Sequence, residues 1–410
     1  MNFSVDRLRS AFPALRTSVR KKPVVYFDNA CMTLKPEPVL QAMDEYYRDF
    51  PGCHARTDHL FGAETSRRYE EARRKVAAFF NAADPREIVF TRNATEGLNL
   101  LAHTLDFKPG DVVVSSDIEH NSNLLPWQAL EKRKGVRRLV VSTRPDTGFD
   151  LDRFREQMTP AVRLVTVLHT SNLTGVGFPI AEIVRIAHGF GALVCVDAAQ
   201  AALSHKIDVR GLDVDFLVAS VHKMWGPTGM GILYGKRGLL EALPQFLTGG
   251  GTVEDAGYSS VTVHGLPDKF EAGLQNYAGA LGAGAAVDFI REVGQDNIAG
   301  QVRELNRRAT ALLAGMKGVT ILGPSDAALR SGILNIVIDG MEASDAARVL
   351  HESENVMVRF GKHCVHPWYA ARRVPDSLRI SFGAYNTAGE VDSMAAALRN
   401  VLKFFRQKAC

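Results

Sequence analysis

The sequence lacks long apolar runs, low-complexity tracts and internal repeats. No apolar stretch approaches the ~18 residues that a membrane-spanning helix requires. Residues 1–10 are charged and have no apolar signal-peptide core. These absences argue against a membrane-spanning or fibrous protein. We therefore expect a cytoplasmic protein with no membrane partner.

Paired cysteines are also absent. The five cysteines form an odd set without a CxxC pair: Cys31, Cys53, Cys195, Cys364 and Cys410. This set argues against a disulfide framework and against a structural zinc site, and we expect no metal. An unpaired thiol remains available for chemistry.

A strong excess of one charge is missing as well. The 49 basic and 45 acidic residues leave a net charge of +4. Short basic clusters at residues 20–22 and 132–138 have no interleaved aromatic side chains, which is typical of solvated faces. We expect no nucleic-acid partner.

The composition is that of a large globular protein, with 46% hydrophobic and 23% charged residues. A length of 410 residues exceeds the ~250–300 residues at which a single core stops growing. We therefore expect two domains of unequal size. The large domain is predicted at residues 23–294 and the small one at residues 295–410, with residues 1–22 packing on the small domain.

Short apolar runs alternate with amphipathic stretches from about residue 86 to residue 236, which indicates strands joined by helices. The predicted strands are residues 87–91, 112–116, 138–141, 164–169, 193–197, 216–220 and 232–234. One connecting helix places Ile180, Ile183, Val184 and Ala187 on a single face. The pattern predicts an α/β fold with a mainly parallel seven-stranded sheet that is covered on both faces.

Beyond Gln295 the pattern changes to helix, strand, helix, strand, strand and helix, which is typical of a smaller α+β domain. The predicted strands are residues 333–338, 356–359 and 378–382. The last helix opens at Thr387-Ala-Gly-Glu390, a capping box in which each side chain satisfies a backbone N–H group.

A lysine follows one predicted strand, in the segment Ser220-Val-His222-Lys223, and the strand before it ends at Asp197. Ligands of such sheets bind beyond the carboxyl ends of the strands, so Asp197 and Lys223 can face one crevice. A lone lysine is more often a solvated surface residue. An aspartate in this position also serves as a helix N-cap.

Two further polar segments follow strand ends. Residues 90–97 turn from a strand into a helix predicted at residues 98–105, and the backbone N–H groups at Ala94 and Thr95 suit a phosphate. His120 follows the strand at residues 112–116 and can stack on an aromatic ring, although a lone histidine there is more often a loop residue. Each of these signals is weak alone.

Together, the order of these residues resembles that of the class V aminotransferase-like enzymes, which depend on pyridoxal 5′-phosphate (PLP). The similarity runs over about residues 23–405 and is carried by Thr95, His120, Asn172, Asp197, Gln200, Ser220, His222 and Lys223. It implies the PLP-dependent fold type I, which is the aspartate aminotransferase-like fold.

The resemblance also implies cofactor roles. Lys223 would hold PLP as a Schiff base, Asp197 would keep the pyridine nitrogen protonated, and Gln200 would contact the ring hydroxyl. His120 would stack on the ring and move protons. The remaining residues at the cofactor, mainly around its phosphate, would be Ala94, Thr95, Asn172, Ser220 and His222.

Two motifs near the C-terminus narrow the resemblance. Val-Arg-Phe-Gly-Lys-His-Cys at residues 358–364 and Arg379-x-Ser-x-x-x-Tyr-Asn-Thr387 are similar to cysteine desulfurases of the SufS-like, short-loop group II branch. This implies conversion of L-cysteine to L-alanine, with the sulfur left on Cys364 as a persulfide. A sulfur-acceptor or carrier protein would then collect it for iron–sulfur cluster or other sulfur-containing cofactor biosynthesis.

The same branch implies the substrate site. Asn172 and Arg379 would bind the substrate carboxylate, which the planar fork of an arginine matches. Arg359 and Arg56 would be further substrate-binding residues. The family also implies a homodimer, with residues 249–277 crossing between the subunits and Arg56 contributing from that side.

Cys364 is the residue on which sulfur transfer depends. A free thiol titrates near ~8.5, so we expect the positive neighbours His363 and Arg359 to favour the reactive thiolate. A buried and inert cysteine is the alternative interpretation of Cys364.

Three positions depart from the family pattern. Leu274 stands where a threonine usually reaches the phosphate of the neighbouring subunit. Cys31 stands where a small residue lies beside the substrate, and a free cysteine also serves there as a packing residue. The segment Ala55-Arg56-Thr-Asp-His59 replaces a His-Arg-x-x-His pattern.

Two other kinds of function remain compatible with the sequence. One is a related enzyme, such as a cysteine or cystine C–S lyase, a selenocysteine lyase or an epimerase, which does not need an acceptor thiol. The other is a non-catalytic sulfur-assembly scaffold with the same fold, against which the intact set of Lys223, Asp197 and His120 argues.

Overall fold

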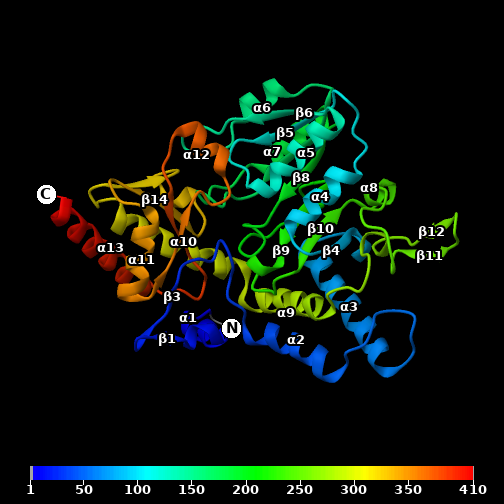
Figure 1. Ribbon diagram of the computed structural model, residues 1–410, viewed down its shortest axis with the longest axis horizontal. Coiled ribbons are helices and arrows are strands. Elements are labelled where there is room, and N and C mark those ends of the chain that lie inside the picture. Colours follow the sequence, from blue (N-terminus) through cyan, green and yellow to red (C-terminus); the bar gives the residue numbers. More distant parts are fainter. Residues whose placement is uncertain (1–2, 410) are drawn as a thin grey trace.

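The computed structural model describes residues 3–409 and contains two principal sheets (Figure 1). Cys410 lies outside the described residues. The seven-stranded sheet stands on the right of Figure 1, and the four-stranded sheet, with its helices, stands on the left. Of the helices in residues 3–409, none pairs the length with the apolarity that crossing a lipid bilayer takes.

The seven-stranded sheet has the order β4-β10-β9-β8-β7-β5-β6. Only β10 runs antiparallel to its neighbours, so the expected mainly parallel sheet is confirmed. Its strands are β4 (Ile88–Thr91), β5 (Val112–Ser116), β6 (Arg137–Val141), β7 (Val162–Leu168), β8 (Leu193–Asp197), β9 (Phe216–Ser220) and β10 (Gly231–Gly235).

Successive strand residues point to opposite faces, and both faces of this sheet are buried. One face, with Val89, Leu164 and Val218, joins a hydrophobic cluster with α4 (Ala94–Thr104) and α5 (Leu125–Lys134). The other face belongs to a cluster that includes α7 (Ile180–Gly189) and α9 (Tyr277–Val293). The predicted apolar stripe of α7 is buried there as expected. Other elements of this region are α2 (Glu37–Asp49), α3 (Leu60–Phe79), α6 (Leu151–Gln157), α8 (Arg237–Ala242), β11 (Val253–Ala256) and β12 (Val261–Val263).

The four-stranded sheet is antiparallel, with the order β13-β14-β17-β16. Its strands are β13 (Val319–Leu322), β14 (Ile333–Ile338), β16 (Arg359–Gly361) and β17 (Ser377–Ser381), and the nearby helices are α10 (Gln295–Leu313), α11 (Ala343–Glu354), α12 (His366–Arg372) and α13 (Ala388–Ala409). The capping box of α13 is confirmed, because Glu390 N donates to Thr387 Oγ1 at 3.1 Å and Thr387 N donates to Glu390 Oε2 at 2.9 Å.

The strand predicted at residues 356–359 is wrong as one element. β15 (Val356–Met357) pairs in parallel with β3 (Val25–Tyr26), whereas β16 begins at Arg359 and pairs with β17. The backbone changes partner at Val358, which an apolar run in the sequence does not show. Short elements near the N-terminus are α1 (Val5–Ser10), β1 (Ser18–Val19) and β2 (Lys22–Pro23).

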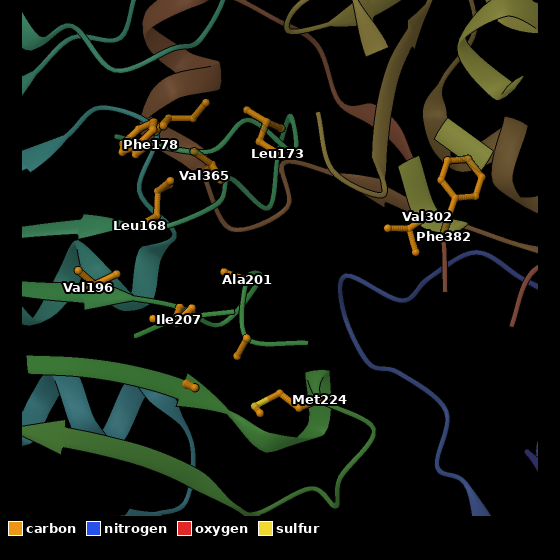
Figure 2. Close-up of a cluster of buried hydrophobic side chains, with 14 of the residues drawn as sticks. Leu168, Leu173, Phe178, Val196, Ala201, Ile207, Met224, Val302, Val365 and Phe382 are labelled. Atoms are coloured by element: carbon orange, nitrogen blue, oxygen red, sulfur yellow. The ribbon is translucent and has the colours of Figure 1, made fainter. Parts of the chain in front are cut away.

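The N-terminal segment contacts the C-terminal part of the chain. Arg9 Nη2 lies 2.9 Å from Glu390 Oε1, and Asn355 Nδ2 donates to Val19 O at 2.7 Å. Apolar contacts also join the two sheet regions. The cluster drawn in Figure 2 contains Leu168, Val196 and Met224 together with Val302 and Phe382.

Candidate active site

A cavity of about 260 Å³ lies where β7, β8 and β9 end and where residues of the four-stranded sheet approach them. Nearly every residue predicted from the sequence lines this cavity: Ala94, Thr95, His120, Asn172, Asp197, Gln200, Ser220, His222, Lys223, Arg359, Cys364 and Arg379. Arg56 does not line it and is exposed in this chain. Sequence reasoning missed Asn93, Thr170 and Ser122, which also line the cavity.

Lys223 and Asp197 occupy the ends of adjacent strands. Lys223 closes a 3₁₀ turn, Val221–Lys223, directly after β9, and burial lowers the pKa of its amine. Asp197 ends β8, and burial raises the pKa of its carboxyl, while the nearby Lys223 charge lowers it. No helix starts after Asp197, whose Oδ1 instead accepts a 3.0 Å hydrogen bond from Ala199 N in a turn. The surface-lysine and helix-cap alternatives therefore do not apply.

The anion site predicted from the sequence falls at the N-terminus of α4, which begins at Ala94, earlier than the predicted residue 98. Asn93 caps the helix by accepting from Glu96 N at 3.0 Å, and this N-cap explains the earlier start. Ala94 N donates to Ser220 Oγ at 3.0 Å, which joins the helix start to the end of β9. A side chain on Gly231 of β10 would place its Cβ 2.4 Å from the Asn93 backbone, so glycine permits this close approach.

His120 lines the cavity together with Thr95 at the start of α4 and with Cys364 of the loop at residues 362–365, the cysteine loop. Its Nδ1 accepts a hydrogen bond from Ser122 N at 3.1 Å. Burial, with the nearby charges of Lys223 and Arg379, lowers the pKa of its ring to about 3. The imidazole is therefore neutral at neutral pH and has a face suited to an aromatic ring.

Glu119, next to His120 in the chain, is a buried carboxyl that does not line the cavity. Ser116 Oγ donates to its Oε1 at 2.5 Å, Leu168 N donates to the same atom at 3.1 Å, and Asn123 Nδ2 donates to its Oε2 at 2.7 Å. Burial nevertheless raises its pKa to about 8. These bonds fix the backbone from which His120 projects.

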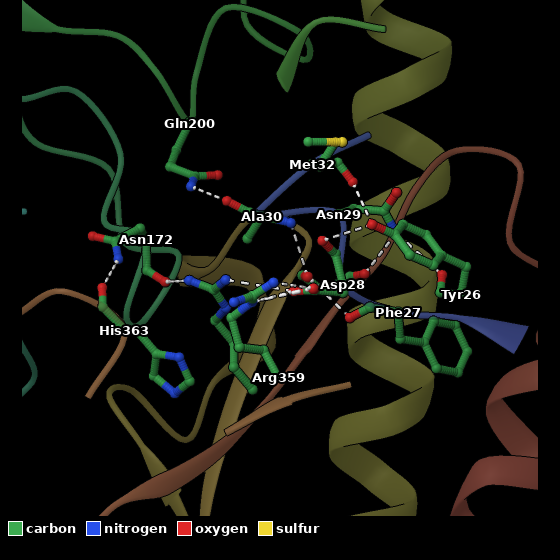
Figure 3. A network of polar contacts seen from close by, with 12 residues as sticks. Tyr26, Phe27, Asp28, Asn29, Ala30, Met32, Asn172, Gln200, Arg359 and His363 are labelled. Carbon is green, nitrogen blue, oxygen red and sulfur yellow. Dashed lines mark hydrogen bonds and ion pairs between the residues drawn. The ribbon is translucent and has the colours of Figure 1, made fainter. Parts of the chain in front are cut away.

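Arg359 of β16 and Arg379 of β17 both line the cavity, and Figure 3 labels Arg359 beside Asp28. Arg359 Nη2 lies 2.7 Å from Asp28 Oδ2. Arg379 is buried and donates from Nη1 to Asn172 O at 3.0 Å, while its Nη2 lies 3.7 Å from Asp28 Oδ1. The Nε of Arg379 has no hydrogen-bond partner among the residues that the structure describes. A buried donor without a partner is costly, so Arg379 is suited to an anionic ligand.

The cysteine loop is attached to the edge of the large sheet. Asn121 N donates to Cys364 O at 2.7 Å, and Asn172 Nδ2 donates to His363 O at 2.7 Å. His363 and Cys364 both have left-handed backbones, with φ of 48° and 59°. Cys364 is exposed, so the buried and inert alternative does not apply.

One expectation about this loop is wrong. His363 is buried, and burial with the charges of Arg379 and Arg359 lowers the pKa of its ring to about 2. Its Nε2 lies 3.0 Å from Ser377 Oγ. His363 is therefore neutral and brings no positive charge to Cys364. Arg359 keeps its charge but is paired with Asp28.

The donor set of the cavity fits PLP. The α4 N-terminus with Ser220 and His222 suits the phosphate, a primary amine is available at Lys223, and a carboxyl stands on the adjacent strand at Asp197. The Nε of Arg379, which has no partner among the described residues, is a further donor suited to an anionic group.

Residues 25–394 match the family model described as aminotransferase class-V. The chain belongs to this family. Its members depend on PLP, so the cofactor inferred from the cavity agrees with the family.

Curated relatives and solved structures match this chain over nearly its full length. A probable cysteine desulfurase of Vibrio cholerae is 36% identical to this chain, and the match covers 98% of this chain and 99% of that protein. A cysteine desulfurase of an Enterobacter strain is 38% identical over the same shares of both chains. The apo structure of the Thermococcus onnurineus cysteine desulfurase has a TM-score of 0.93 and 34% identity, over 98% of this chain and 99% of that chain. The Escherichia coli cysteine desulfurase CsdA has a TM-score of 0.91 and 34% identity, over 98% and 100%.

Proposed function

We propose that this protein is a PLP-dependent cysteine desulfurase that converts L-cysteine to L-alanine and leaves the sulfur on Cys364 as a persulfide. One observation carries the proposal: a single cavity contains the half-buried Lys223, the carboxyl of Asp197 and the exposed thiol of Cys364. The cysteine desulfurases that match the chain over 98% of its length support the same reaction.

Lys223 and Asp197 carry the cofactor chemistry in this proposal. When bound, PLP supplies an electron sink for the charge left at Cα after proton loss. Burial lowers the pKa of the Lys223 amine, so a larger share of it is neutral and able to take the Cα proton. Asp197 would hold a proton on the pyridine nitrogen of PLP, and Gln200 would contact its ring hydroxyl. His120, as a neutral imidazole, would stack on the ring.

Different elements of the cavity wall would bind the phosphate and the substrate carboxylate. Ala94, Thr95, Ser220 and His222 would hold the phosphate at the start of α4. Arg379 binds the carboxylate of cysteine through its free Nε, and Asn172 and Arg359 help to form this end of the site.

Cys364 is the acceptor thiol. Its Sγ attacks the sulfur of bound cysteine, so that a new S–S bond forms while the Cβ–S bond of the substrate breaks. The carbon product is L-alanine. The two hydrogen bonds that hold the loop keep the persulfide near the cavity. We therefore propose that a sulfur-carrier protein with its own mobile cysteine must reach Cys364.

Several finer assignments form part of the proposal. The short loop before Cys364 favours the SufS-like group II branch and a role in iron–sulfur cluster or related cofactor biosynthesis. We also propose a cytoplasmic homodimer with a large domain at residues 23–294 and a small domain at residues 295–410. Arg56 would then reach the partner's site.

Leu274 is 77% exposed and offers no polar group to a phosphate.

The test measures alanine, sulfide and protein-bound persulfide from L-cysteine, in wild type and in Cys364→Ala, with Cys53→Ala as the matched thiol control. We expect Cys364→Ala to lose persulfide and sulfur transfer while Cys53→Ala keeps both. A C–S lyase would instead release sulfide in the Cys364→Ala protein. A selenocysteine lyase would turn over L-selenocysteine but not L-cysteine, and a scaffold would have no visible absorbance band after incubation with PLP.

A further inference from the structure

The cavity contains a second cysteine that the proposed reaction does not use. Cys31 lines the same cavity as Cys364 and Lys223, and it is a free, half-buried thiol. The other two described cysteines, Cys53 and Cys195, do not line this cavity. The site therefore has two thiols of unequal exposure around one reaction centre.

The backbone on which Cys31 stands is attached to both sheet regions. Gln200 Nε2 donates to Ala30 O at 2.8 Å, and Ala30 N donates to Ser381 Oγ at 2.9 Å. Cys31 N closes a turn onto Asp28 O at 3.1 Å. These bonds fix the backbone position of Cys31 relative to the cavity, so Cys31 is not a loosely packed residue.

Cys31 lies close to three cationic side chains and to the carboxylate of Asp28, which pairs with Arg359. A negative charge on its sulfur stabilises the protonated forms of Lys223, Arg359 and Arg379, so all three lie within its electrostatic range. A negative charge on Cys364 also acts on Lys223.

Two buried side chains at the cavity each have a nitrogen atom that makes no hydrogen bond within the described residues. Arg379 is 3% exposed and His363 is 7% exposed, and among residues 3–409 neither Arg379 Nε nor His363 Nδ1 has a hydrogen-bond partner. Both side chains line the cavity. Arg379 Nε is a donor beside the space that Cys31 and Cys364 share, so an anionic group there is well placed for stabilisation.

We propose that Cys31 is a second sulfur acceptor, which takes the sulfane sulfur from the Cys364 persulfide. This step rests on the proposed desulfurase function. The Cys31 thiolate attacks the terminal sulfur, and a Cys31 Sγ–S bond forms as the bond between that sulfur and Cys364 Sγ breaks. Cys364 leaves as a thiolate with the electron pair, so there is no net oxidation or reduction.

The transfer moves sulfur from the exposed thiol to the less exposed one. It also frees Cys364 to accept sulfur from another cysteine molecule before any carrier protein arrives. Each subunit then stores one additional sulfur atom, in a position that small thiols in solution reach less easily.

The test uses the PLP-loaded protein with excess L-cysteine and no reductant or acceptor, and it measures the initial burst of alanine by rapid quench. Each transferred sulfur corresponds to one alanine, so we expect about two alanines per subunit in wild type and about one in Cys31→Ala. Cys31→Ser should match Cys31→Ala, and Cys53→Ala should keep the wild-type burst. After alkylation, peptide mass spectrometry should find persulfide on Cys31 and Cys364 in wild type.

The outcomes separate the two proposals. Equal bursts in wild type and Cys31→Ala, with no persulfide on Cys31, overturn the second acceptor while the desulfurase function stands. Persulfide on Cys31 in the Cys364→Ala protein also overturns it, because the sulfur would then bypass Cys364. Absence of alanine and of Cys364 persulfide in wild type refutes the desulfurase function itself.

Discussion

Asn172 donates a 2.7 Å hydrogen bond from its side-chain amide to the carbonyl oxygen of His363, the residue directly before Cys364. The backbone carbonyl of Asn172 also accepts from Arg379 at 3.0 Å. One residue from the loop after β7 therefore positions both the acceptor loop and the arginine assigned to the substrate carboxylate.

Asn172→Ala should slow persulfide formation on Cys364. The buried His363 carbonyl loses its donor, which costs about 1–3 kcal/mol and corresponds to a rate lower by about ten- to a hundredfold. Rapid quench with persulfide labelling measures this rate. Asn121→Ala is the matched control, because it removes a side chain that contacts His366 but keeps the backbone bond to Cys364. Equal losses in the two variants would contradict the positioning role of Asn172.

Lys223→Ala should abolish the visible absorbance of lysine-bound PLP together with turnover. The reason is that Lys223 is the amine in the cavity beside Asp197. Absorbance spectra of the purified protein, with added PLP, measure the effect. Lys35→Ala is the control, since Lys35 Nζ donates to His222 O at 3.0 Å without lining the cavity, and it should keep the band. An unchanged band in Lys223→Ala would refute the assignment.

Arg379→Lys should raise KM for L-cysteine by about ten- to a hundredfold, because a lysine lacks the planar fork that binds a carboxylate bidentately. Steady-state kinetics of alanine formation measure KM and kcat separately. Arg359→Lys should have the smaller effect, since Arg359 is already paired with Asp28. The assignment is wrong if the order of the two effects is reversed.

Glu119→Gln should change how stability depends on pH. In the folded protein the pKa of Glu119 is about 8, whereas the ordinary value of 4.5 applies to the unfolded chain. The protonated carboxyl therefore stabilises the folded protein below pH 4.5, and this stabilisation is lost as pH rises towards 8. Wild type should lose on the order of 2–4 kcal/mol of unfolding free energy over this range. Glutamine cannot ionise and should remove that loss.

Urea unfolding of the PLP-loaded protein at pH 5 and pH 8 measures the effect. Glu182→Gln, on the exposed side of α7, is the control and should retain the wild-type dependence. If Glu119→Gln and wild type lose the same stability between the two pH values, Glu119 is ionised in the folded protein and this prediction fails.

The sequence predicted best those residues whose position depends on local order. Asp197, Lys223 and His120 each follow an apolar run long enough to mark a buried strand, and parallel strands bring such ends to one edge. The capping box at Thr387 was predictable for the same reason, because its partners are three residues apart.

Properties set by tertiary packing were not predictable. The partners Arg359 and Asp28 are separated by 331 positions, and no local pattern joins them. His363 looked like a positive neighbour of Cys364 because its burial, which makes it neutral, is invisible in the sequence. The change of strand partner at Val358 is likewise decided by β3 and β17, which lie far away along the chain.

The attachment of Ala30 has a consequence for the order in which the protein matures during synthesis. Ala30 N bonds to the hydroxyl of Ser381, which is 351 positions later, and Ala30 O bonds to Gln200. A ribosome makes Ala30 351 residues before Ser381, so the bond between them forms only after Ser381 has left the ribosome. The wall of the cavity that carries Cys31 therefore cannot be completed on a nascent chain, and a truncated translation product has an open site.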